Sequence, residues 1–71
     1  MRGRLDEAMV HLTEALRLRP EFPLAHYNLG CVLAELGKHD DALAQLREAL
    51  RQKGDYVEAR QKLRELGASS E

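Results

Sequence analysis

The chain has 71 residues, of which 44% are hydrophobic and 32% charged, a composition that fits one small helical domain and excludes a disordered tail. Eleven Lys and Arg residues against twelve Asp and Glu leave a net charge of −1, so the chain has no basic field for nucleic acid or an anionic membrane. The charged opening MRGRLDEA lacks the apolar run of a signal peptide, and the sequence contains no apolar span long enough for a membrane helix. We therefore expect a cytoplasmic protein without membrane insertion.

An internal repeat organises the chain. The segment GRLDEAMVHLTEALRLRPEF, which begins at Gly3, aligns without a gap with GKHDDALAQLREALRQKGDY, which begins at Gly37, 34 positions later. The aromatic residues Phe22 and Tyr56 also match. A period of this length is typical of stacked helical units.

The first predicted helix runs from Leu5 to Leu18. It carries Ala and Leu at positions i, i+4, i+7 and i+8, which place them in one apolar stripe, and the same stripe recurs in a helix that follows Gly37. Acidic pairs should open both helices, where the positive end of the helix dipole favours them. The two stripes are Ala8, Leu12, Ala15 and Leu16, then Ala42, Leu46, Ala49 and Leu50, and the acidic pairs are Asp6-Glu7 and Asp40-Asp41.

The stretch between the two blocks predicts a helix that is buried from several sides. Pro23 is well placed near its start, and residues Leu24 to Leu36 are apolar nearly all round. Gly37 then supplies a left-handed C-terminal stop. Gly30 lies in the middle, although glycine in a helix interior costs about 1 kcal/mol relative to alanine. A neighbouring element must therefore need the space that a side chain would fill.

The last predicted helix, Tyr56 to Leu66, has only one apolar stripe, formed by Tyr56, Ala59, Leu63 and Leu66. The rest of its surface is polar, and Glu58 and Lys62 have the i, i+4 spacing of an ion pair. Arg64 occupies the position that corresponds to Gly30. This pattern predicts a helix that caps a stack, followed by a short polar tail.

These residues resemble the tetratricopeptide repeat (TPR) family. Its pattern has a Leu-Gly pair in the first helix of each repeat (helix A), a turn glycine, two alanines in the second helix (helix B) and a closing proline, matched here by Leu29-Gly30, Gly37, Ala42, Ala49 and Pro20. The departures are His26 and His39 at frequent aromatic positions and Gly54 in place of a second closing proline.

The resemblance implies an all-α fold, an antiparallel helix-turn-helix solenoid fragment of about four helices. In this arrangement Gly30 would face Ala42 across the hairpin, so that two small residues let helices A and B approach closely. Residues 1–71 would form a single short domain: helix B of a first repeat at 3–22, a full repeat at 23–56, a capping helix at 57–67 and a flexible tail at 68–71.

The residue content does not favour an enzyme. Cys31 is the sole plausible nucleophile, and the histidine nearest in sequence, His26, lies on a different helix face. His26 and His39 would be about 20 Å apart along the hairpin, so they cannot share a metal ion. We expect no metal and no cofactor, with His26 and His39 as partly buried aromatic substitutes, His11 on the surface and Cys31 as a partly accessible, inert residue.

The resemblance implies a protein–protein interaction module that binds an extended peptide or partner protein on the concave face of its A helices. Asn28 is the most informative residue there, because an amide can both donate to and accept from a peptide backbone. The alternative is that Asn28 is solvated or bonded within the chain. Glu58 and Lys62 would largely cancel each other's charge, which argues against a clamp for a terminal carboxylate. The implied binding residues are Leu24, Tyr27, Asn28, Cys31, Ala34 and Glu35, with Glu58, Gln61, Lys62 and Glu65 on the capping helix.

A second hypothesis is self-assembly. The first helix would be a B helix without its A helix, and its flank near Met9 and Leu16 would turn toward residues Leu24 to Leu36. Its other face would leave an apolar strip open to water, which a homodimer could bury. The strip consists of Leu5, Ala8, Leu12 and Ala15.

Overall fold

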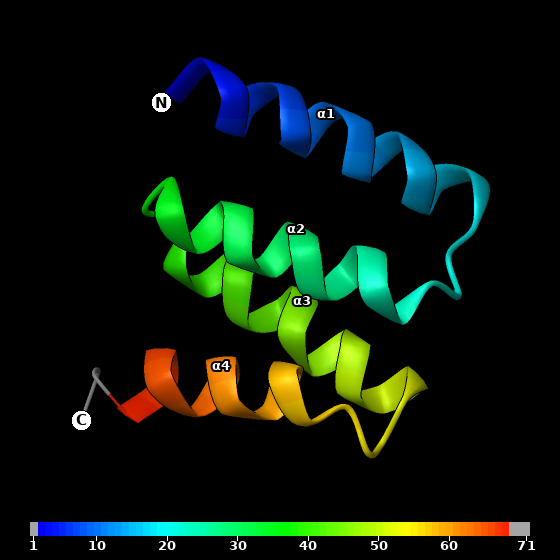
Figure 1. Ribbon diagram of the computed structural model, residues 1–71, viewed down its shortest axis with the longest axis vertical. Coiled ribbons are helices and arrows are strands. Elements are labelled where there is room, and N and C mark those ends of the chain that lie inside the picture. The colour runs from blue at the N-terminus through cyan, green and yellow to red at the C-terminus, as the bar shows by residue number, and fades with distance from the viewer. Residues whose placement is uncertain (1, 69–71) are drawn as a thin grey trace.

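The computed structural model describes residues 2–68 and contains four helices: α1 (Arg2–Leu18), α2 (Pro23–Glu35), α3 (His39–Gln52) and α4 (Val57–Ala68). They follow one another along the longest axis of the molecule, with α1 at the top and α4 at the bottom of Figure 1. The described residues form no strand, and the predicted all-α class is confirmed. Of the predicted tail, residue 68 belongs to α4, and residues 69–71 lie outside the described residues.

The predicted start of the first helix is wrong. Helix α1 begins at Arg2 and has no acidic residue in its first turn, so Asp6 and Glu7 lie inside the helix instead of opening it. Gly3 weakens a helix but does not stop one, which lets the helix extend toward the N-terminus. Asp40 and Asp41 do lie in the first turn of α3, as predicted.

The turn between α2 and α3 reverses the chain at Gly37. Its φ of 82° lies in the left-handed region, which glycine enters without the steric cost of a side chain. The N–H of Gly37 donates to the carbonyl of Ala34 over 3.1 Å, and the N–H of Lys38 donates to that of Leu33 over 2.8 Å. Both the predicted stop and the predicted Pro23 in the first turn of α2 are confirmed.

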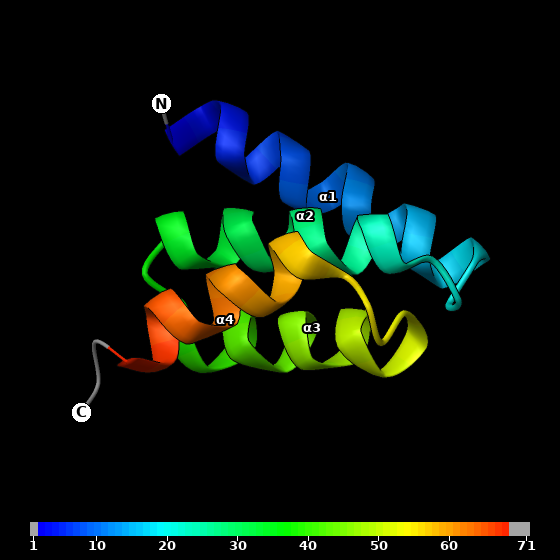
Figure 2. The same cartoon turned by 60° about the horizontal axis from the view of Figure 1, so that its bottom comes forward.

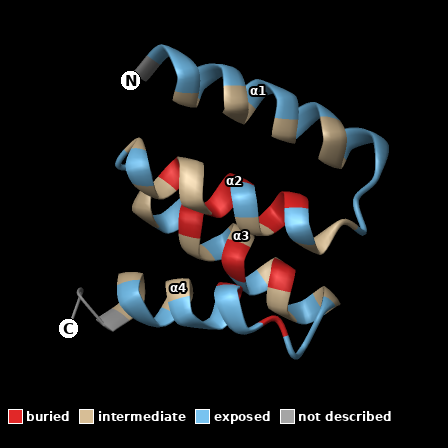
Figure 3. Cartoon of the chain, viewed as in Figure 1, coloured by how far each residue is buried: buried red, intermediate tan, exposed pale blue. Residues whose placement is uncertain are grey.

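The core lies between α2 and α3, which form the most extensive helix pair, while α1 packs on α2 and α4 on α3. Figure 2 shows the same arrangement from a second side. Figure 3 shows the buried residues gathered on α2, on α3 and around the start of α4, whereas none of the described residues of α1 is buried. The buried apolar residues are Ala25, Leu29, Leu33, Ala42, Leu46, Ala49, Tyr56 and Ala59.

Gly30 lies where α2 crosses α3. A Cβ atom at this position would stand 2.9 Å from Cγ of Leu46 and 3.2 Å from the carbonyl oxygen of Ala42. Leu46 is 0% exposed, so neighbouring atoms enclose it on every side. Gly30 therefore faces the backbone of Ala42, as predicted, but the side chain that occupies the space is Leu46.

A group of polar side chains fastens the turn between α1 and α2 to the end of α3. Arg51 donates to Glu48 on its own helix and, over 3.2 Å, to Glu21 in the turn. Gln52 Nε2 donates to the carbonyl oxygen of Pro20 over 2.9 Å and to Glu48 over 2.8 Å. Hydrogen bonds, chiefly from Arg51 and to a smaller extent from Gln52, lower the pKa of Glu48 to about 2.

This shift predicts an acid-sensitive contribution to stability. The pKa of Glu48 in the folded chain lies below its ordinary value of 4.5, so its charge stabilises the fold above pH 4.5 and ceases to do so as the pH falls toward 2. We expect Glu48→Gln to lower the thermal midpoint at pH 7, and we expect its difference from the wild type to narrow steadily below pH 4.5. Circular-dichroism melts across this range would measure the difference, with the exposed Glu7→Gln as a control. A constant difference would contradict the assignment.

Candidate functional site

One open hollow lies between α2 and α4. Its lining is Tyr27 from α2 together with Glu58, Gln61, Lys62 and Glu65 from α4, and its volume is about 260 Å³. These five residues come from two helices that are separated in sequence by the whole of α3. All five were among the residues expected on the concave face, so the structure brings this part of the predicted set together.

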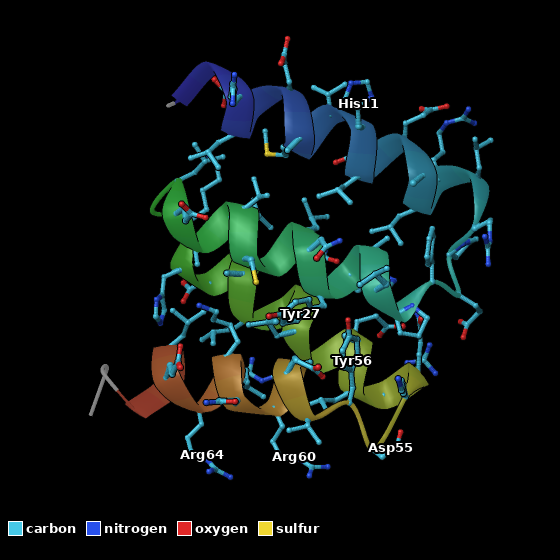
Figure 4. All side chains as sticks on the ribbon, viewed as in Figure 1. His11, Tyr27, Asp55, Tyr56, Arg60 and Arg64 are labelled. Carbon is cyan, nitrogen blue, oxygen red and sulfur yellow. The ribbon has the colours of Figure 1, made fainter. Side chains whose placement is uncertain are left out.

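A pair of aromatic rings joins α2 to the start of α4. The ring centroids of Tyr27 and Tyr56 are 5.3 Å apart, with a tilt of 41° between the ring planes. Figure 4 shows the two side chains next to each other between these helices. Tyr56 is buried in a cluster with Leu46, Ala49 and Ala59, and Tyr27 packs against that cluster. The Tyr27 wall of the hollow is therefore anchored to the core.

The hydroxyl groups of both tyrosines stay protonated at neutral pH. Burial raises the pKa of Tyr27, and its hydrogen bond with Cys31 and the negative charge of Glu58 raise it further. Burial also raises the pKa of Tyr56, with a smaller contribution from Glu58. The hollow thus offers a neutral aromatic wall that can form hydrogen bonds, not an activated nucleophile.

The ion pair on α4 differs from the predicted one. Lys62 Nζ lies 3.5 Å from Oε1 of Glu65, whereas Glu58 and Lys62 do not form a salt bridge. Lys62 has an acidic neighbour at i−4 and another at i+3, and both spacings bring side chains together on a helix. The negative charge of Glu58 instead contributes to the raised pKa values of Tyr27 and Tyr56. The lining therefore holds two carboxylates and one ammonium group, and the ammonium group is already paired.

A second hollow adjoins the first and shares Glu58 with it. Leu24, which is 53% exposed, lies there. The sequence reasoning missed Lys53 in this hollow, whose ammonium group lies 4.9 Å from the ring centroid of Tyr56. The sequence contained a signal, because Arg19 and Phe22 occupy the equivalent positions one repeat earlier. In the structure Arg19 lies over Phe22 in the same way. The lining of this second hollow is Phe22, Pro23, Leu24, Lys53, Tyr56 and Glu58.

Asn28, Cys31 and Glu35 line neither hollow. Asn28 and Glu35 are exposed, and Cys31 is half-buried with a free thiol. Their spacing on α2 keeps them within about 100° of Tyr27 around the helix. The side chain of Asn28 is exposed and forms no hydrogen bond within residues 2–68, which leaves the amide either solvated or open to a ligand.

The three histidines have different surroundings. His26 is buried, with Nε2 donating to the carbonyl of Pro20 over 2.9 Å and Nδ1 lying 2.7 Å from Oε1 of Gln45. His39 is half-buried and His11 is exposed, as predicted. Across the described part of the chain, no three His, Cys, Asp or Glu side chains converge in a way that could hold a metal ion.

The residues of the self-association hypothesis are only partly open to water, since Leu5, Ala8, Leu12 and Ala15 are all half-buried. Leu12 packs against the cluster of Leu29, Leu33 and Ala42, together with Met9 and Leu16. Met9 and Leu16 therefore turn toward α2 as predicted, but Leu12 was assigned to the wrong side. The apolar stripe of α1 is wide enough to contact two neighbouring helices. The helical period alone therefore does not show which of its residues contact α2.

Helices packed each on the one before it, with antiparallel hairpins that recur at a fixed period, define a helical repeat protein. A family model described as TPR repeat matches residues 1–37, and a second, described as Tetratricopeptide repeat, matches residues 23–52. The chain belongs to the tetratricopeptide repeat family. No curated protein matches it.

TPR repeats are in general protein–protein interaction modules, and catalysis is not typical of the family. None of the helices within residues 2–68 combines the length and the apolar character that a membrane crossing requires.

Proposed function

We propose that this chain binds an extended peptide segment of another protein across α2 and α4 and carries out no catalysis. The observation that supports this most is the hollow between Tyr27 and four polar residues of α4. A peptide backbone in this hollow would lie against the ring of Tyr27. It could form hydrogen bonds with the hydroxyl group of that tyrosine and with the amide and charged groups of α4. Leu24 and Cys31 on α2 would contact its side chains, and Asn28 and Glu35 would pair with its backbone or polar groups.

The charges favour a neutral or basic segment over a terminal carboxylate. Lys62 is the only cation of the first hollow, and its ammonium group is 3.5 Å from the carboxylate of Glu65. Glu58 and Glu65 together outweigh it. A free C-terminal carboxylate would meet repulsion there. A selected peptide should therefore bind no more tightly with a free C-terminus than with an amidated one.

Asn28 provides the sharpest test of this function. Peptides selected from a random library on the immobilised chain would serve as probes, and their affinity would be measured by calorimetry. We expect Asn28→Ala to weaken binding by about 1–3 kcal/mol, roughly 5- to 150-fold, because it leaves peptide groups unpaired. Arg47→Ala, at an exposed position on α3, is the control and should bind as the wild type does. Equal losses in both variants would contradict the proposal.

Self-assembly through α1 has less support. The four residues that were expected to form an open strip are half-buried, and Leu12 is committed to the contact with α2. The exposed large apolar residues of α1 are Val10 and Leu18. They lie at different angles around the helix and do not form one continuous patch.

A further inference from the structure

The two hollows adjoin each other at Glu58, which lines both of them. The first hollow extends from Glu58 along α4 to Glu65, a rise of about 10 Å along the helix. The second lies on the other side of Glu58, beside Leu24 at the start of α2. Alternate side chains of an extended peptide point to the same side and are about 7 Å apart. Two such side chains of one segment can therefore enter the two hollows, one on each side of Glu58.

The first hollow has an excess of negative charge, and this excess comes from Glu58. Lys62 and Glu65 are paired, so their charges offset each other. The carboxylate of Glu58 is exposed and forms neither a salt bridge nor a hydrogen bond within residues 2–68. After burial, its charge is a further cause of the raised pKa of both Tyr27 and Tyr56. An unpaired carboxylate beside two phenol rings is thus available to a cation.

The ring of Tyr27 adds to the attraction for a cation. The faces of aromatic rings attract ammonium and guanidinium groups. The chain shows this at the neighbouring ring, where Lys53 Nζ lies 4.9 Å from the centroid of Tyr56. Among the described residues, no cation lies over Tyr27 in the same way. A basic side chain of a ligand would therefore meet both a carboxylate and an aromatic ring in the first hollow.

The second hollow has a different character. Phe22, Pro23 and Leu24 give it an apolar wall, and Leu24 is 53% exposed. Its charged residues are Lys53 and Glu58, one of each sign, so the hollow has no net charge. An aliphatic or aromatic side chain would bury apolar surface there, which favours binding.

We propose that the segment bound by this chain carries a lysine or arginine in the first hollow and an aliphatic or aromatic residue, two positions away, in the second. This inference rests on the proposed peptide-binding function and names the class of segment that is bound. Glu58 selects the basic side chain, and Leu24 selects the apolar one. An acidic side chain in the first hollow would meet the unpaired carboxylate and be rejected.

Selection from a random peptide library on the wild-type chain and on two variants tests this motif. We expect wild-type binders to carry both residues at the stated spacing. Glu58→Gln should remove the basic preference and keep the apolar one, and Leu24→Ser should do the reverse. Both residues are exposed, so neither change disturbs the core. Glu7→Gln and Val10→Ser, at exposed positions of α1, are the matched controls and should select the same peptides as the wild type.

Calorimetry with one selected peptide measures the size of the effect. Replacing its basic residue with norleucine removes the charge and keeps an unbranched side chain. This change should weaken binding to the wild type roughly 3- to 5-fold, as for an exposed ion pair, and binding to Glu58→Gln less than about 2-fold. The difference between the two chains should shrink at high salt, because added ions screen exposed charges.

The outcomes separate this inference from the function on which it rests. Binders that depend on Asn28 but lack the basic residue would overturn the inference and leave the proposed function in place. The same holds if Glu58→Gln prefers the basic residue as strongly as the wild type does. A library that yields no binder dependent on Asn28 would overturn both.

Discussion

Replacing Gly30 with leucine should strongly destabilise the fold. The first added carbon would stand 2.9 Å from Leu46 Cγ and 3.1 Å from its Cδ2, and the backbone carbonyl of Ala42 blocks a second direction. Since Leu46 is fully buried, α2 and α3 would have to separate. Overpacking of this kind costs about 1–3 kcal/mol, a large share of what a core of this size supplies. Thermal melts followed by circular dichroism would measure the loss.

Arg64→Leu is the matched control, because Arg64 is the equivalent residue of α4 and is exposed. Its effect should remain within about 0.5 kcal/mol, as for other surface substitutions. Gly30→Ala should fall between these two variants, since the gain of about 1 kcal/mol in helix propensity opposes the contact with Leu46. Melts in which Gly30→Leu is no less stable than Arg64→Leu would refute the close-approach explanation.

Truncating Leu46 to alanine should have the largest effect of any apolar truncation in the chain. Leu46 is the largest fully buried side chain, and it belongs to the cluster that anchors Tyr56 and Ala59 while it also fills the space beside Gly30. Its loss removes contacts with both neighbouring helices and leaves a cavity. Such substitutions cost about 2–5 kcal/mol, and the core of so small a domain rarely supplies more than about 3–5 kcal/mol.

Urea titration at 25 °C would show whether Leu46→Ala still has a folded baseline. Val57→Ala is a suitable control because Val57 is also apolar but 62% exposed. We expect the control to lower the free energy of unfolding by less than about 0.5 kcal/mol. A Leu46→Ala chain with a cooperative transition close to that of the control would contradict this prediction, because the stability of the core would then not depend on Leu46.

The sequence was sufficient for the helix order because the repeat and the glycine positions constrain it strongly. Gly30 in an otherwise apolar helix indicated a close helix contact, and in the structure this glycine meets Leu46 and the backbone of Ala42. The reversal at Gly37 followed from its freedom to adopt a positive φ.

The errors concern choices between nearly equal local alternatives. Lys62 could pair with Glu58 or with Glu65, and the structure shows the pair with Glu65. This choice depends on side-chain conformations, which cannot be derived from the sequence. Leu12 lies near the centre of a wide stripe, so a helical period places it on that stripe without saying which neighbour it contacts. The contact between Tyr27 and α4 depends on the distance between α2 and α4. This distance follows from how both helices pack on α3, which the sequence does not give.

Chemical-shift mapping of the ¹⁵N-labelled chain, titrated with a library-selected peptide, tests the central proposal most directly. We expect the largest shifts at Tyr27, Asn28 and Cys31 on α2 and at Gln61 and Lys62 on α4, with α1 and the exposed side of α3 unchanged. Shifts that leave these five residues unmoved and fall on another surface instead would contradict the proposed peptide-binding site.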